Sequence, residues 1–129
     1  MASIQNSLDN LLTADGALCA AVVDSTSGMM LGAIGSGVDL EVAAAGNTEV
    51  MRAKLKTMRA LGLNDSIEDI LITLGKQYHL LRPMAQKEGV FIYFVLDKSK
   101  SNLALARRKL QEVEKLSLIH ISEPTRLRR

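Results

Sequence analysis

Hydrophobic and polar positions along the chain change their period several times, and each change marks a different element. Residues 3–13 place isoleucine and leucine side chains about one helical turn apart, which predicts a short amphipathic helix. The continuous apolar run at 18–23 indicates a strand covered on both faces, and residues 29–34 predict a second strand. Because a segment rich in serine and glycine separates the two strands, we expect them to form a hairpin.

A long helix is predicted between residues 41 and 61. Asp39 is a favourable N-cap, and Gly62 followed by Leu63 indicates a Schellman motif at the C-terminal end. At ~1.5 Å per residue such a helix is roughly 30 Å long, whereas five strands spaced ~4.8 Å apart span only about 19 Å. We therefore expect the helix to cross a five-stranded sheet obliquely, from one edge to the other.

Three more strands and a last helix are predicted after the long helix. Alternating apolar residues at 67–74 and an apolar stretch at 77–83 flank the two-residue turn Gly75-Lys76, a pattern typical of a hairpin. Residues 90–96 are almost entirely apolar and indicate a central strand, and the spacing of leucine and alanine beyond them predicts a terminal helix. The resulting order, α-β-β-α-β-β-β-α, places the chain in the α+β class.

Length and charge point to one domain followed by a tail. Of the 129 residues, those at 117–129 include three arginines and one glutamate, whereas residues 1–116 hold 13 basic and 13 acidic side chains. The domain is therefore neutral, and nothing in it favours nucleic-acid binding. The tail contains Pro124 and is similar to peptides produced when a reading frame runs through a cloning adapter. We interpret 1–116 as the domain and 117–129 as a non-native or disordered tail.

Segment composition also bears on location. No apolar run approaches the ~20 residues that span a bilayer, so membrane insertion is not expected. The first ten residues lack the charged and apolar regions of a secretory signal. A single cysteine, Cys19, excludes an intramolecular disulfide. Together these features predict a cytoplasmic protein.

The sequence offers little catalytic chemistry. His79 lies within a strand pattern and His120 within the tail, and no second histidine or cysteine stands at metal-ligand spacing. Cys19 is expected to be a small buried side chain. Neither the dinucleotide-binding pattern nor the phosphate-loop pattern of NTPases is present. We therefore expect no enzyme activity, no cofactor and no metal.

Three segments carry a resemblance to a known family: the end of the long helix, MRALGL, the hairpin ILITLGKQYHLLRP and the apolar strand VFIYFVLD. With the element order, they resemble the roadblock/dynein light chain family over residues 3–116. The resemblance implies a roadblock/profilin-like fold, in which a five-stranded antiparallel sheet has one long helix on one face and two terminal helices on the other. It further implies a bacterial-type regulator that binds, and sometimes stimulates, small Ras-like GTPases.

The resemblance also implies self-association, through the strand that follows the long helix. The composition favours this independently, because that strand is apolar on both faces although the connectivity places it at an edge, where it would aggregate unless paired. We expect a homodimer, or a heterodimer with a paralogous roadblock subunit. The predicted dimer interface comprises residues from the helix and the strand: Met51, Leu55, Met58, Ile70, Leu71, Ile72 and Leu74.

A basic stripe on the long helix is the candidate surface for another partner. Arg52, Lys56 and Arg59 follow the spacing of one helix face, and such a stripe could attract the acidic surface of a GTPase. A solvated helix face is the alternative interpretation. Two further functions stay open at this point: a structural scaffold or light-chain-like subunit without effect on nucleotide turnover, and a small-molecule sensor domain.

Overall fold

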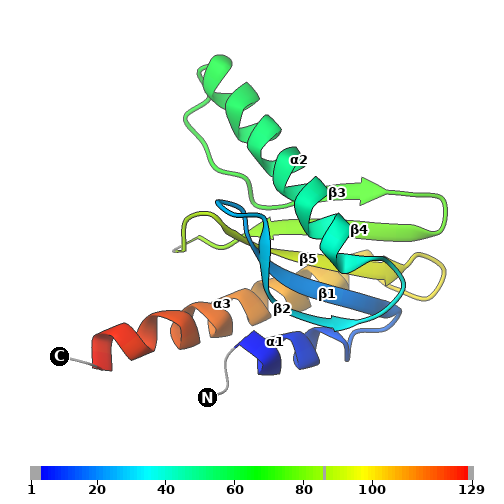
Figure 1. Ribbon diagram of the computed structural model, residues 1–129. Coiled ribbons are helices and arrows are strands. Elements are labelled where there is room, and N and C mark those ends of the chain that lie inside the picture. The colour runs from blue at the N-terminus through cyan, green and yellow to red at the C-terminus, as the bar shows by residue number, and fades with distance from the viewer. Residues whose placement is uncertain (1–3, 86, 128–129) are drawn as a thin grey trace.

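The computed structural model of the chain describes residues 4–85 and 87–127, and its element order is the one predicted from the sequence (Figure 1). The elements are α1 (Ile4–Leu11), β1 (Ala17–Asp24), β2 (Met29–Gly35), α2 (Leu40–Ala60), β3 (Ile70–Thr73), β4 (Gln77–Pro83), β5 (Val90–Asp97) and α3 (Leu103–Leu127). The helix α3 includes much of the segment that the sequence set apart as a tail. The non-native origin of that segment stays a prediction.

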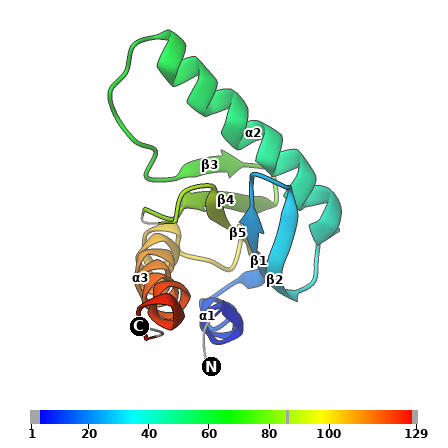
Figure 2. The same cartoon turned by 60° about the vertical axis from the view of Figure 1, so that its left-hand side comes forward.

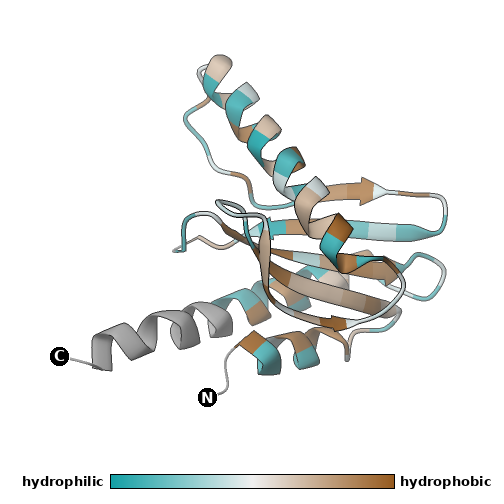
Figure 3. Ribbon diagram, in the orientation of Figure 1, coloured by the Kyte–Doolittle hydropathy of each residue, from teal (hydrophilic) through white to brown (hydrophobic). Residues whose placement is uncertain are grey.

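The five strands form one antiparallel sheet in the order β2-β1-β5-β4-β3. The most apolar strand, β5, lies at the centre, as its composition predicted, and β1 lies beside it. Every residue of β5 from Val90 to Leu96 is buried. Figure 3 shows the same contrast, with hydrophobic colour along the central strands and mixed colour along α2. The two edge strands are β2 and β3.

Helices cover both faces of the sheet, but unequally (Figure 2). The terminal helices α1 and α3 lie side by side on one face, where Leu8, Leu110 and Phe94 belong to a single buried cluster. On the other face α2 lies alone, mainly over β1 and β2, and its contribution to the core there is Ala44 and Met51. This is the arrangement of one long helix opposite two terminal helices that the resemblance implied.

The ends of α2 are fixed as the sequence predicted. The Oδ1 atom of Asp39 accepts a hydrogen bond of 3.3 Å from the N–H of Val42. At the other end Gly62, at φ 73°, donates to the carbonyl of Arg59 over 3.0 Å, and Leu63 donates to that of Met58 over 3.0 Å. These two bonds define a Schellman motif, which requires a residue of positive φ.

The path of α2 differs from the expected edge-to-edge crossing. Its first half lies on the sheet, whereas its second half rises away and extends past β3 (Figures 1 and 2). Leu55, Leu61 and Leu63 are accordingly exposed. A straight helix cannot follow a twisted sheet over its whole length, so its far end leaves the surface.

Strand β3 is shorter than the predicted 67–74. Its pairing with β4 runs from Ile70 opposite Leu81 to Thr73 opposite Tyr78. Continuing that register would set Glu68 opposite Pro83, which has no N–H to donate, so the ladder cannot extend there. The carbonyl of Glu68 instead accepts a 3.2 Å hydrogen bond from Nη1 of Arg82.

Candidate protein-interaction surfaces

Cys19 and His79, two residues that could carry chemistry, lie on different strands of the sheet, β1 and β4. Within residues 4–85 and 87–127, no three histidine, cysteine or carboxylate side chains come close enough together to hold a metal ion. Cys19 is buried in β1, and its burial raises the pKa of the thiol. None of the helices described there is long and apolar enough to span a membrane.

His79 takes part in a half-buried polar chain on the α2 face of the sheet. Its Nδ1 atom lies 2.9 Å from the hydroxyl of Tyr93, and its Nε2 atom lies 2.8 Å from Oε1 of Gln77. Burial lowers the pKa of the imidazole and raises the pKa of Tyr93 to about 12. A protonated tyrosine can donate to Nδ1 while Nε2–H donates to Gln77, so the neutral histidine satisfies both bonds. Hydrogen bonds to Tyr93 and Gln77 thus occupy both ring nitrogens of His79.

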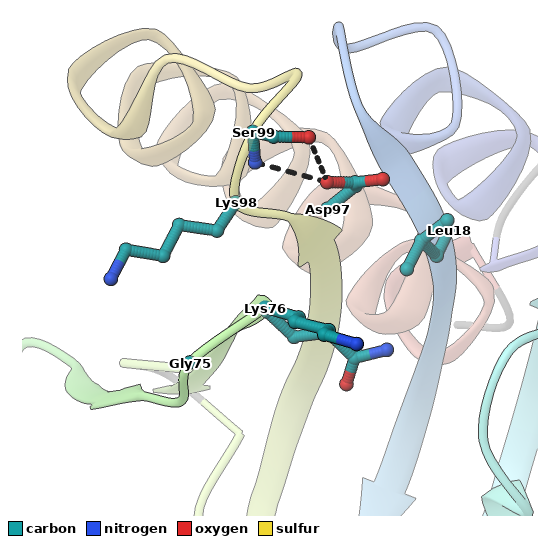
Figure 4. A pocket seen from close by; sticks show the side chains of 7 residues that line it. Leu18, Gly75, Lys76, Asp97, Lys98 and Ser99 are labelled. Atoms are coloured by element: carbon teal, nitrogen blue, oxygen red, sulfur yellow. Dashed lines mark hydrogen bonds between the residues drawn. The ribbon is translucent and has the colours of Figure 1, made fainter.

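A hollow of about 630 Å³ lies where the β3–β4 turn meets the end of β5 (Figure 4). The side chains of Lys76 and Lys98 line it but point apart. The Oδ1 atom of Asp97 accepts hydrogen bonds from the N–H and the hydroxyl of Ser99, at 2.9 and 2.8 Å. These hydrogen bonds lower the pKa of the carboxyl. Ligand sites usually have a few polar groups that point toward one bound molecule. The polar groups around this hollow point in different directions, so it does not resemble such a site.

The residues predicted for a dimer interface fall into two groups. Met51 and Met58 are buried by their own chain, at 3% and 9% exposure, and Leu71 packs against the cluster beneath α1 and α3. The others are at least partly accessible: Ile70 and Ile72 are half-buried, and Leu55 and Leu74 are exposed. The second group thus lies on edge strand β3, directly after it and on the second half of α2.

Two more apolar residues, one on α2 and one at its C-cap, lie outside the set predicted from the sequence. Val50 and Leu61 are exposed, at 38% and 66%. They are 11 residues apart, about three helical turns, and therefore share a flank of the helix. Gly46 lies close to the same flank, and a Cβ atom added there would meet nothing within 4 Å. The 11-residue spacing was the available signal, but the buried methionine stripe is the more obvious pattern in the sequence.

Of the three basic residues predicted to dock a partner, Arg52 already has partners within the chain. Its Nη2 atom donates to the carbonyls of Ser25 and Thr26 over 2.7 and 3.3 Å, and its Nη1 atom pairs with Glu49 over 3.2 Å. Arg52 therefore joins α2 to the β1–β2 turn. Lys56 and Arg59 are exposed farther along the same helix.

Two ion pairs attach α3 to the sheet near its β3 edge. Nε of Arg82 donates to Oε1 of the buried Glu114 over 2.6 Å, and Oε2 of that carboxylate accepts the N–H of Ala85 over 2.9 Å. Arg107 forms a bidentate pair with Asp69, with both distances 3.1 Å. These contacts anchor the residues that enter β3 and those that leave β4.

Comparison with known proteins identifies the fold. No protein-family model matches the chain, and no curated protein matches it by sequence. Among solved structures, a roadblock/LC7 domain from Streptomyces avermitilis superposes with a TM-score of 0.80 at 10% identity, covering 92% of this chain and 98% of that one. The gliding protein MglB from Thermus thermophilus gives 0.78 at 16% identity, covering 93% and 88%. Myxococcus xanthus MglB gives 0.78 at 18% identity, covering 91% and 94%.

These superpositions include nearly the whole of each chain. Their identities, between 10% and 18%, make them evidence about architecture. The antiparallel sheet, the single long helix on one face and the terminal helices on the other agree with the expectation drawn from the sequence. The chain has the fold of roadblock/LC7 domains.

Proposed function

We propose that this chain is a non-catalytic regulator of a small Ras-like GTPase, and that it acts as a homodimer whose paired long helices form the docking surface. The proposal combines the function implied by the sequence resemblance with one observation. One flank of α2 exposes Val50 and, at the C-cap, Leu61, and α2 lies on the same face of the sheet as the half-buried Ile70 and Ile72 of edge strand β3.

Edge strand β3 supports self-association. In the described structure it pairs with β4 on one side only, and its other edge meets no strand. An apolar strand with an open edge tends to pair with another chain. Pairing two copies of β3 would bring their raised α2 helices near one another. Gly46 lies in the half of α2 that stays on the sheet, and the open space beside it is a further place where a partner helix could come close.

The exposed cations of α2 are the proposed contact to the GTPase. Lys56 and Arg59 are both exposed in the second half of α2. Positive charge at such a site accelerates association with an acidic surface more than it adds affinity. Arg52 is held by the β1–β2 turn and contributes mainly by shaping this part of the helix.

Light scattering on the full chain tests the homodimer. We expect a solution mass of twice the chain mass of 14.0 kDa. The double substitution Val50→Glu and Leu61→Glu places two charges on the exposed flank and should yield a folded monomer. Leu105→Glu on α3, where the leucine is 57% exposed, is the matched control and should remain dimeric. A wild-type chain that stays monomeric at all concentrations would contradict the homodimer.

The GTPase contact is tested separately on the dimer. A small Ras-like GTPase loaded with a non-hydrolysable GTP analogue is titrated against wild type and against Lys56→Glu with Arg59→Glu. The charge reversal should slow association by at least about tenfold at low salt. Arg108→Glu, on the far side of the sheet, is the control. Equal association rates for all variants would remove the basic residues from the contact. In a separate assay with GTP itself, binding that leaves the rate of hydrolysis unchanged would favour the scaffold function.

A further inference from the structure

A groove of about 570 Å³ runs beneath the raised half of α2, at the end of the sheet where β1 and β4 finish. Its walls come from α2, from the segment 65–68 that leads into β3, from residues 82–85 and 88–91, from Ser25 in the β1–β2 turn and from Glu114 of α3. In Figure 1 the first two of these walls are the upper part of α2 and the strand-less segment that follows it.

The floor of the groove is apolar. Met51, Met84 and Phe91 line it and are buried beneath it, whereas Leu55 is 39% exposed at its side. Leu55 is open to solvent beside buried apolar side chains. Covering such a leucine with another apolar group lowers the free energy by about 25 cal/mol per Å² of apolar surface buried. The groove therefore favours a large apolar side chain.

The walls of the groove are held in place by the chain itself. Arg52 joins α2 to the carbonyl of Ser25, and the N–H of Ser25 donates to the carbonyl of Gly89 over 2.6 Å. On the opposite side Arg82 binds both Glu114 and the carbonyl of Glu68. The groove thus exists before anything binds, which lowers the entropic cost of binding.

The rim of the groove is acidic. Three exposed carboxylates, those of Asp65, Glu68 and Glu88, line it, and none of them joins an ion pair within the described part of the chain. Arg82 and Glu114 neutralise one another. Arg59 is then the one remaining cation among the described lining residues, which leaves a net charge of −2 around the apolar floor.

We propose that this groove binds a segment of a partner protein in which large apolar side chains are flanked by lysine or arginine. The apolar side chains would cover Leu55 and the floor, and the cations would lie opposite Asp65, Glu68 and Glu88. The proposal does not depend on the GTPase contact, because it uses the carboxylates of the groove instead of the basic stripe of α2. It adds a second type of partner to the domain.

The test uses a fluorescein-labelled peptide built from alternating pairs of leucine and lysine, titrated against the full chain by fluorescence anisotropy. We expect saturable binding, weakened about tenfold or more by Glu68→Lys with Glu88→Lys. Glu41→Lys with Glu112→Lys changes the net charge equally at exposed positions outside the groove, and should leave binding within about twofold of wild type.

Leu55→Glu separates groove binding from general attraction to a negative surface. It adds an acidic group but removes the exposed apolar side chain, so binding in the groove should weaken whereas non-specific attraction should strengthen. Stronger binding by Leu55→Glu, an equal loss in both lysine variants, or no binding by wild type would overturn the proposal. The same peptide with glutamate in place of lysine should not bind. Light scattering on each sample keeps these results separate from the homodimer test.

Discussion

The two faces of the sheet are built differently. On one face α1 and α3 cover the central strands completely, and Leu8, Leu110 and Phe94 are at most 1% exposed. On the other face a single helix lies over β1 and β2 and then leaves the surface, so that Ile70, Ile72 and His79 stay half-buried. Both faces have apolar residues, but only the first has enough helix to cover them.

Because of this difference, one face of the sheet mainly stabilises the fold, whereas the other is available to bind partners. A fully covered face contributes to the free energy of folding of the chain alone, whereas apolar surface left half-covered is available for association. The open face is also where the exposed flank of α2, edge strand β3 and the acidic groove are found. Substitutions on the two faces should therefore differ in what they change.

The largest expected difference comes from the same substitution made on each face. Leu110→Ala removes a side chain of 1% exposure from between α3 and the sheet and should lower the free energy of unfolding by ~2–5 kcal/mol. Leu55→Ala removes one of 39% exposure and should cost less than about 1 kcal/mol. Urea unfolding of both variants measures this. Equal losses would mean that the two faces are packed alike.

A second large effect is expected at the ion pair that ties α3 to β4. Arg82→Met leaves the carboxylate of Glu114, a residue of 5% exposure, with only the N–H of Ala85. An uncompensated buried charge should destabilise the fold by about 3 kcal/mol. Adding Glu114→Gln to Arg82→Met should restore part of the loss, because it removes that charge. The double variant and both single variants are compared by thermal unfolding, and a double variant less stable than Arg82→Met would contradict the explanation.

A smaller effect of opposite sign is expected on the open face. Gly46→Ala should raise the stability of the single chain by about 1 kcal/mol, since alanine favours a helix and its Cβ meets no atom within 4 Å. If another helix packs closely at this position, the same change should weaken self-association. Urea unfolding at low concentration and light scattering at high concentration give the two quantities. Unchanged association would place the partner helix elsewhere.

The smallest effect is a pH dependence on the open face. Burial lowers the pKa of His79, so the unfolded chain takes up a proton first as the pH falls. The stability contributed by the neutral imidazole should be complete above the unfolded value of about 6.5 and should decline as the pH falls through it toward the lower folded pKa. His79→Gln should flatten this part of the curve of unfolding free energy against pH. An unchanged curve would show that the histidine does not titrate in this range.

Much of the closed face could be predicted from sequence periodicity. The apolar run of β5 and the helical spacing of α1 and α3 both predict side chains that pack against one another within the chain. The structure confirms these three elements and their buried faces. The caps of α2 were predicted correctly because Asp39 and Gly62 act over a few residues. The N-terminal end of α3 is equally local, since Oδ1 of Asn102 accepts the N–H of Leu105 there.

The open face was predicted less well, for a physical reason. Periodicity shows that Met51 and Leu55 share a stripe, but it does not show that Met51 is 3% exposed and Leu55 39%. Ion pairs such as Arg107 with Asp69 connect residues 38 positions apart, and no local pattern specifies them. The groove is lined by residues that range from Ser25 to Glu114, so no local pattern in the sequence indicated it.

The position of β5 also affects the order in which the chain can fold. Strand β1 pairs with β5, so its contacts with that strand, from Asp24 opposite Val90 to Ala17 opposite Leu96, need residues far later in the chain. Contacts between residues this far apart in sequence slow folding, since the loop must close before they form. During synthesis, the apolar edge of β1 stays open until the end of the domain has left the ribosome. Pulse-labelled hydrogen exchange should therefore show β1 and β5 gaining protection together, after the β3–β4 hairpin.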